Sequence, residues 1–264
     1  MKKYIKQIEK TLLKISKKLK SFSEIRSFII VGSYPKEISS CPNDVDCIVI
    51  TNKSLSSSVK NKIHNQLAPY NINYSDDSVR LRLNSVEFGL TYIKSKKFYS
   101  QIKSLISGHA LSIRKKDVTW AVGGNLPEVM LSDLSRCRIV FDKDNLISSI
   151  KSDLLKQYPK ALKVNLIDSL NCEIQTKISL IDRYLKQSNA FMAKVGISDV
   201  AIAVYRLIHV NNNLYPLGLK HIQHYDYLKT KNGFSGLIKD LLETSESDNL
   251  EENISRLKEI YRKI

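Results

Sequence analysis

Two aspartates separated by one residue, Asp44 and Asp46, have the types and spacing that suggest chemistry. They stand at the start of a run that is otherwise apolar, residues 45–51, which is typical of a buried strand: Asp44 directly precedes it and Asp46 is its second residue. Side chains two apart on a strand point to the same face, so the two carboxylates lie side by side. They repel each other unless a cation lies between them, and Mg²⁺ binds one or two carboxylates together with phosphate oxygens. The spacing therefore predicts a magnesium site at the start of this strand.

A turn that could bind phosphate precedes the aspartates. Residues 28–31 form an apolar run that predicts another buried strand, and Gly32-Ser33 ends it. Pro35 stands where a first helical turn tolerates proline, and the free N–H groups of a helix N-terminus bind phosphate. We therefore expect Gly32 and Ser33 to contact the phosphates of a nucleotide. Lys36 is a further candidate contact, with an exposed helix lysine as the alternative.

Taken together, these residues resemble a known signature. Gly32-Ser33, a gap of ten residues and then Asp44-Val45-Asp46 are similar to the motif of the polymerase-β-like nucleotidyltransferase superfamily. That family carries a third carboxylate on a later strand, and Glu87 lies in the apolar residues 86–93. In order and spacing the motif is similar to that of the antibiotic nucleotidyltransferases.

The resemblance implies an enzyme that transfers a nucleoside monophosphate from a nucleoside triphosphate, with ATP favoured, to a hydroxyl of an acceptor. It implies that Asp44, Asp46 and Glu87 bind Mg²⁺ and that Glu87 deprotonates the acceptor. The chain departs from the pattern at Asn43, where many members have Ser, and at Lys36, where many have Arg. Neither departure removes a metal ligand.

Several acceptors stay open. Length and layout resemble those of small-molecule enzymes of antibiotic resistance, which favours a small acceptor. The net charge of +16 matches a polycationic aminoglycoside poorly and a weakly charged hydroxyl compound such as a lincosamide better. RNA, including tRNA modified by a toxin-like enzyme, fits this charge best, and a protein hydroxyl is a third alternative. Outside catalysis, the alternatives are a nucleotide- or RNA-binding member and an α/β domain with incidental acids.

Apolar periodicity predicts an α+β fold. Strands and helices alternate over residues 1–143, which predicts a mixed-sheet catalytic domain with flanking helices, and residues 144–264 predict an all-α domain. In the first domain, residues 79–83 and 86–93 read as a tight hairpin. In the second, Ser198 is a candidate N-cap for a helix over residues 199–210. Lys220 and Tyr215 are candidate nucleotide contacts, with packing of a connecting loop as the alternative.

Composition sets outer bounds. The hydrophobic content of 42% and charged content of 26% are ordinary for a soluble globular protein, and no apolar run is long enough to predict a membrane span or a signal peptide. The four cysteines lack metal-ligand spacing, so we expect free thiols and a cytoplasmic protein.

Residues 1–20 hold eight lysines and one glutamate. They predict an amphipathic helix over residues 3–20, whose lysines form a solvated face or a surface for polyanions; its apolar stripe consists of Ile5, Ile8, Leu12, Ile15 and Leu19.

Overall fold

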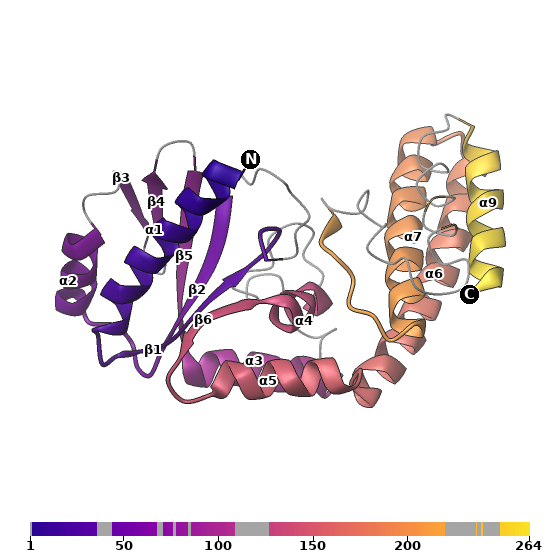
Figure 1. The fold of residues 1–264 in the computed structure, drawn as a ribbon. Coiled ribbons are helices and arrows are strands. Elements are labelled where there is room, and N and C mark those ends of the chain that lie inside the picture. The colour runs from indigo at the N-terminus through magenta and orange to yellow at the C-terminus, as the bar shows by residue number, and fades with distance from the viewer. Residues whose placement is uncertain are drawn as a thin grey trace. The chain divides into compact units, whose positions relative to one another are not determined.

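The computed structural model describes residues 2–35, 44–67, 71–75, 78–83, 86–108, 127–219, 236, 239 and 249–264. The chain forms two compact units (Figure 1). The first comprises Met1–Ser104 and Met130–Gln157, and the second comprises Leu105–Val129 and Tyr158–Ile264. A mixed sheet with helices followed by a helical region makes the fold α+β, as predicted. The domain boundary at residues 143 and 144 stays a prediction.

The described strands of the first unit form a six-stranded sheet in the order β3-β4-β5-β2-β1-β6. Strands β2 and β5 pair in parallel, whereas the pairs β1–β2, β1–β6, β3–β4 and β4–β5 are antiparallel. The sheet is therefore mixed. The strands are β1 (Ile25–Val31), β2 (Asp44–Thr51), β3 (Asn71–Ser75), β4 (Ser78–Leu83), β5 (Val86–Lys94) and β6 (Arg138–Asp142).

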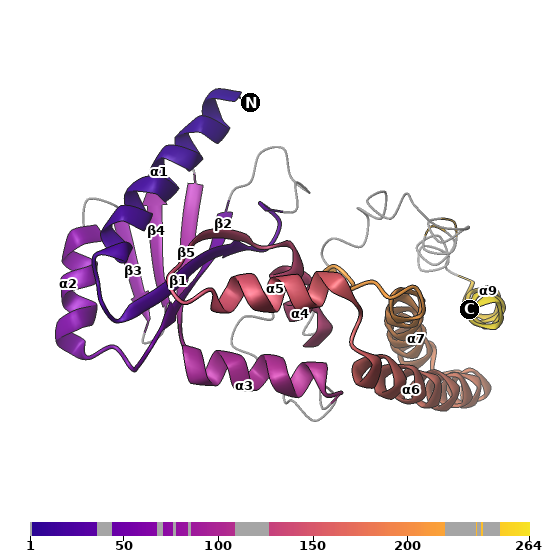
Figure 2. The same ribbon diagram turned by 60° about the horizontal axis from the view of Figure 1, so that its bottom comes forward.

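Helices accompany this sheet in the order α1 (Lys2–Lys20), α2 (Ser57–Leu67), α3 (Ser95–Ile106), α4 (Pro127–Arg136) and α5 (Leu146–Lys156). Figure 2, like Figure 1, shows α3 and α5 running alongside each other. Helices α1 and α2 share a hydrophobic core with one face of the sheet, which joins the apolar stripe of α1 to strand residues such as Phe28, Val45 and Phe88. The predicted stripe is buried from Ile8 to Leu19, while Ile5 at its start is 37% exposed.

The second unit is built on α6 (Lys160–Lys186), α7 (Ala190–Asn211) and α9 (Leu250–Lys263). Helix α7 begins earlier than predicted. Asn189 caps it by accepting a hydrogen bond from the Met192 N–H (3.1 Å), whereas the Ser198 hydroxyl donates to the Lys194 carbonyl inside the helix (3.1 Å). The N-cap prediction for Ser198 was therefore wrong, because serine can also satisfy its hydroxyl on the preceding helical turn.

Across the described residues, no helix combines the length and the apolar character needed to span a bilayer. Cys47, Cys137 and Cys172 are free thiols, as predicted, and Cys41 lies outside the described residues.

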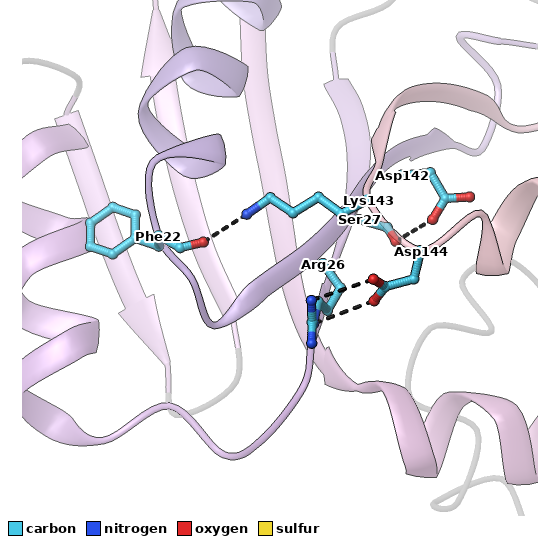
Figure 3. A network of polar contacts seen from close by, with 6 residues as sticks. All are labelled: Phe22, Arg26, Ser27, Asp142, Lys143 and Asp144. Atoms are coloured by element: carbon cyan, nitrogen blue, oxygen red, sulfur yellow. Dashed lines mark hydrogen bonds and ion pairs between the residues drawn. The ribbon is translucent and has the colours of Figure 1, made fainter.

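Asp142, at the end of β6, joins three elements of the first unit, and Figure 3 shows its contact with Ser27 of β1. Its carboxylate accepts hydrogen bonds from the Ser27 hydroxyl on β1 (2.7 Å) and from the N–H and hydroxyl of Ser148 in α5 (2.9 and 3.0 Å). Next to it, the Lys143 ammonium donates to the Phe22 carbonyl in the turn before β1 (3.0 Å). These bonds fix the edge of the sheet at which α5 begins.

We expect Asp142→Ala to lower the free energy of unfolding by about 1–3 kcal/mol, because it leaves the fully buried Ser27 hydroxyl without its acceptor. Asp144→Ala is the matched control. Asp144 pairs with Arg26 at 3.3 Å, but both side chains are exposed to solvent (51% and 38%). We expect that variant to lose no more than about 1 kcal/mol. Urea denaturation of both variants measures the difference, and equal losses would contradict the assigned role of Asp142.

Candidate functional site

The parallel register of β2 and β5 brings the predicted acids together. Asp44 is the register partner of Glu87, and Asp46 is the partner of Gly89. Side chains of neighbouring strands share a face at such positions, so all three carboxylates lie on one face at the start of the two strands. Asp44 is exposed, and Asp46 and Glu87 are partly buried. The alternate residues Val45 and Phe88 point into the core that covers the other face.

The turn that follows β1 lies against Asp46. Gly32 adopts φ 77°, a left-handed conformation that favours glycine. A Cβ at Gly32 would lie 2.8 Å from Oδ2 of Asp46, and a Cβ at Gly89 would lie 3.7 Å from Oδ1. The Asp46 carboxylate thus lies between two glycines, and at Gly32 any larger residue would displace it. Ser33 is partly buried in the same turn.

Arg80 binds the third carboxylate. Its guanidinium donates to Oε1 of Glu87 at 2.9 Å, and the two side chains are 66% and 41% exposed. Arg80 stands opposite Gly89 across the β4–β5 pair, so it reaches Glu87 diagonally. An ion pair so open to water contributes no more than about 1 kcal/mol, and it can be exchanged for another contact at little cost.

No group of three or more His, Cys, Asp or Glu within the described ranges is arranged to hold a metal ion. The three-ligand magnesium site formed by Asp44, Asp46 and Glu87 therefore stays a prediction. Asp44 and Asp46 alone supply the number and type of protein ligands that Mg²⁺ takes when phosphate oxygens complete its shell.

A second arginine–glutamate pair holds the turn in place. On α1, Glu9 accepts two hydrogen bonds from the Arg138 guanidinium of β6 (2.6 and 2.7 Å) and one from the Tyr34 hydroxyl. Arg138 also lies over the Tyr34 ring, 5.9 Å from its centroid. Because Tyr34 follows Ser33 directly, this network links α1, β6 and the turn beside Asp46.

The electrostatics of this network follow from its geometry. Hydrogen bonds from Arg138 hold the pKa of the Glu9 carboxyl below its usual value, against an opposing effect of partial burial. Burial, followed by the hydrogen bond to Glu9, raises the pKa of the Tyr34 hydroxyl. Glu9 is thus held as an anion and Tyr34 as a neutral donor.

Sequence reasoning missed Glu9, Tyr34, Arg138 and Arg80. One signal was available for Arg80: a two-residue connection between β4 and β5 puts Leu83 opposite Val86. Counting outward then puts Arg82 opposite Glu87 and Arg80 opposite Gly89, diagonal to Glu87 on the same face. No local signal exists for Glu9 and Arg138, because they are 129 positions apart and only the sheet order brings them together.

Three further residues were predicted to contact the nucleotide, and the structure describes one of them, Tyr215. Lys36, the helix predicted to begin at Pro35, and Lys220 lie outside the described residues. Tyr215, in the second unit, is 7% exposed and stacks on Tyr158 with ring centroids 4.8 Å apart. Its ring is therefore used in packing within that unit.

Comparisons with known proteins give low-identity matches. Residues 124–221 match a family described as a domain of unknown function, DUF4037. No curated protein matches the chain. The chain is similar to the crystal structure of a nucleotidyltransferase-like protein from Exiguobacterium sibiricum 255-15, with 14% identity and a TM-score of 0.49 over 97% of this chain and 75% of that one.

A second similarity is to spectinomycin adenyltransferase AAD(9) from Enterococcus faecialis, whose crystal structure contains ATP and spectinomycin. It has 12% identity and a TM-score of 0.39 and covers 98% of this chain and 99% of that one. At these identities and scores, neither similarity assigns an activity or a substrate to the present chain.

We expect Gly32→Ala to destabilise the protein by about 1–2 kcal/mol, because alanine disfavours the left-handed conformation and its Cβ would meet Asp46. Gly89→Ala touches the same carboxylate at an ordinary contact distance of 3.7 Å. We expect that control to stay within about 0.5 kcal/mol of the wild type. Urea denaturation compares the two, and a Gly32→Ala variant as stable as Gly89→Ala would contradict the close approach.

The Glu9 network predicts a pH dependence. A carboxyl whose pKa is lowered by folding adds stability above its unfolded pKa, and this stability is lost as the pH falls through the folded value. We expect the wild type to exceed Glu9→Gln by about 1 kcal/mol near neutral pH, with the difference shrinking as the pH falls below the unfolded pKa of about 4.3. Denaturant titrations from pH 7 to pH 3 measure it, and a difference as large at pH 3 as at pH 7 would argue against an ionised Glu9.

Proposed function

We propose that this protein is a nucleotidyltransferase that moves a nucleoside monophosphate from a nucleoside triphosphate, with ATP favoured, to a hydroxyl of an acceptor. One observation carries the proposal: Asp44 stands opposite Glu87 in parallel strands, while the carboxylate of Asp46 lies against the Gly32 turn. Two carboxylates, a third acid and a glycine turn at one end of a sheet match what the reaction needs.

Asp44 and Asp46 are the residues that would hold Mg²⁺. They lie on one face of β2, and carboxylates are the protein ligands this ion prefers. When bound, Mg²⁺ supplies positive charge that stabilises the phosphate oxygens during transfer.

Ser33 and the backbone of the turn bind phosphate in this proposal. The N–H groups of the turn and the Ser33 hydroxyl donate to the oxygens of the leaving pyrophosphate, where negative charge develops. The Glu9 network keeps the turn in position through Tyr34. Glu9, Tyr34 and Arg138 are thus positioning residues.

Glu87 is the general base. It leaves Arg80 and accepts the proton of the acceptor hydroxyl. The acceptor oxygen then forms a bond to the α-phosphorus, the bond from that phosphorus to the bridging oxygen breaks, and pyrophosphate leaves with the electron pair. Separating Glu87 from Arg80 costs no more than about 1 kcal/mol, because the pair is open to water.

Two acceptor classes remain as proposals. The first is a weakly charged small molecule with a free hydroxyl, of the kind modified by antibiotic-resistance enzymes. The second is RNA, and the exposed lysines along α1 favour it. A polycationic acceptor would be repelled by a chain with a net charge of +16.

Transfer of label from α-³²P-labelled nucleoside triphosphates, with Mg²⁺ and either total RNA or a panel of hydroxyl compounds, tests the proposal. We expect Asp46→Asn to reduce transfer to background and Glu87→Gln to reduce it by about 10²–10⁴-fold. Arg80→Gln is the control, because it removes the partner of Glu87 without removing an acid.

Circular dichroism and urea denaturation of each variant confirm that it is folded. Transfer by Asp46→Asn at the wild-type rate would rule out its metal role. Transfer to no acceptor in either set by the wild-type protein would overturn the proposed reaction.

A further inference from the structure

Helix α1 carries a stripe of lysines opposite its buried face. Ile8, Leu12, Ile15 and Leu19 are at most 1% exposed, and Lys6, Lys10, Lys14 and Lys17 are all exposed. The lysines recur at intervals of four, four and three residues, the spacing of neighbours on one helix face. Each lies two positions from a buried residue, which is about 200° around a helix of 3.6 residues per turn. These four residues are called the lysine stripe below.

The charge of the lysine stripe is not compensated within the described part of the chain. None of its four ammonium groups makes an ion pair there. Glu9, the acid on α1, already accepts hydrogen bonds from Arg138 and Tyr34. The stripe is therefore a row of four positive charges directed at solvent.

The length of the stripe suits a strand of phosphates. At a rise of 1.5 Å per residue, the eleven steps from Lys6 to Lys17 span about 16 Å. A nucleic acid strand in a helix carries one phosphate per about 3.4 Å of axis, and an extended single strand spaces its phosphates more widely, so the stripe runs past at most about five phosphates. Lysine binds phosphate as a flexible point charge and needs no fixed register.

Two other partners fit less well. A membrane-binding amphipathic helix inserts its apolar face, but the apolar face of α1 is buried in the core of the first unit. The large apolar side chains that α1 exposes among its described positions are Ile5 (37%) and Leu13 (55%). Protein interfaces are depleted in lysine and depend on buried aromatic or apolar anchors, which this row lacks.

The stripe begins near the candidate site. Glu9 lies between Lys6 and Lys10 on the same helix, and its carboxylate binds Tyr34, the residue after Ser33. A strand that lies along α1 therefore passes the turn that is proposed to bind phosphate. RNA also presents a 2′-hydroxyl at every nucleotide, which a hydroxyl-modifying enzyme can use.

We propose that the lysine stripe of α1 is an RNA-binding surface that recognises the phosphates of a single strand. Its consequence, that RNA is the acceptor, rests on the nucleotidyl transfer proposed above. The binding itself does not depend on that reaction.

Fluorescence anisotropy with a fluorescein-labelled, single-stranded 20-nucleotide RNA tests the binding. The test variant is Lys6→Gln/Lys10→Gln/Lys14→Gln/Lys17→Gln, and glutamine keeps the helix propensity of lysine. The matched control is Lys53→Gln/Lys62→Gln/Lys96→Gln/Lys97→Gln, which removes four exposed lysines of the same unit outside α1. Both variants lose four charges, so their difference isolates the position of the charge.

We expect the test variant to bind at least about tenfold more weakly and the control to stay within about threefold of the wild type at 100 mM salt. For single strands, log K for binding falls with log salt concentration, and each lost phosphate contact makes this slope less steep by about 0.7. The loss of four contacts should therefore make it less steep by about 3. Equal weakening of both variants would overturn the proposal, because net charge alone would then explain binding. The proposal would also be overturned if the wild type bound phosphatidylserine vesicles but not the RNA, and if the stripe variant no longer bound the vesicles.

Asp46→Asn separates the two proposals. This variant should bind the RNA as the wild type does while transferring no label. For transfer to RNA, the stripe variant should raise KM and leave kcat at saturating RNA near the wild-type value. If the wild type transfers label to no acceptor, the proposed reaction is wrong, but the anisotropy measurement still tests RNA binding. If the stripe variant binds RNA as tightly as the wild type, only the proposed RNA-binding surface is wrong.

Discussion

Strands β2 and β5 run in parallel, and most of the candidate site depends on this pairing. Parallel neighbours cannot be joined by a hairpin, so the chain needs a crossover, which α2, β3 and β4 provide here. Because β2 and β5 are parallel, both strands start at the same end of the sheet, with Asp44 opposite Glu87. Strand β1 then runs antiparallel to β2 and ends there, which brings Gly32 to Asp46. The two pairings of β2 thus assemble groups from three separate parts of the chain.

The two arginine–glutamate pairs of the first unit differ in a way that suits different roles. Glu9 is bound at both oxygens by Arg138 and also by Tyr34, and it links α1, β6 and the turn after β1. Glu87 has one hydrogen bond from an arginine that is two-thirds exposed. The first pair is a structural contact with a fixed geometry. The second neutralises an acid at the site and can be broken when a substrate brings its own charge.

The sequence predicted elements better than their assembly. The strands around Asp44 and Glu87 were found because apolar runs report burial directly, and α1 was found because its buried stripe has helical spacing. Sheet order carries no such local signal, so the contact between Glu9 and Arg138 could not be predicted. Helix α7 shows a different failure: Ser198 has the right residue type for a cap, but its hydroxyl is satisfied within the helix and Asn189 is the cap. Residue type limits the options, and tertiary packing chooses among them.

The lysines of helix α1 do more than keep the protein in solution, because they also affect the stability of the helix. Like charges at intervals of three or four residues each destabilise a helix by about 0.2–0.5 kcal/mol. The first turn of α1 contains no acid to favour the helix dipole. The buried residues from Ile8 to Leu19 offset these costs through the core. A phosphate strand along the outer face would remove the repulsion that the core now has to overcome, so binding of RNA and stabilisation of α1 would be coupled. The helix that positions the turn through Glu9 would then also respond to the acceptor.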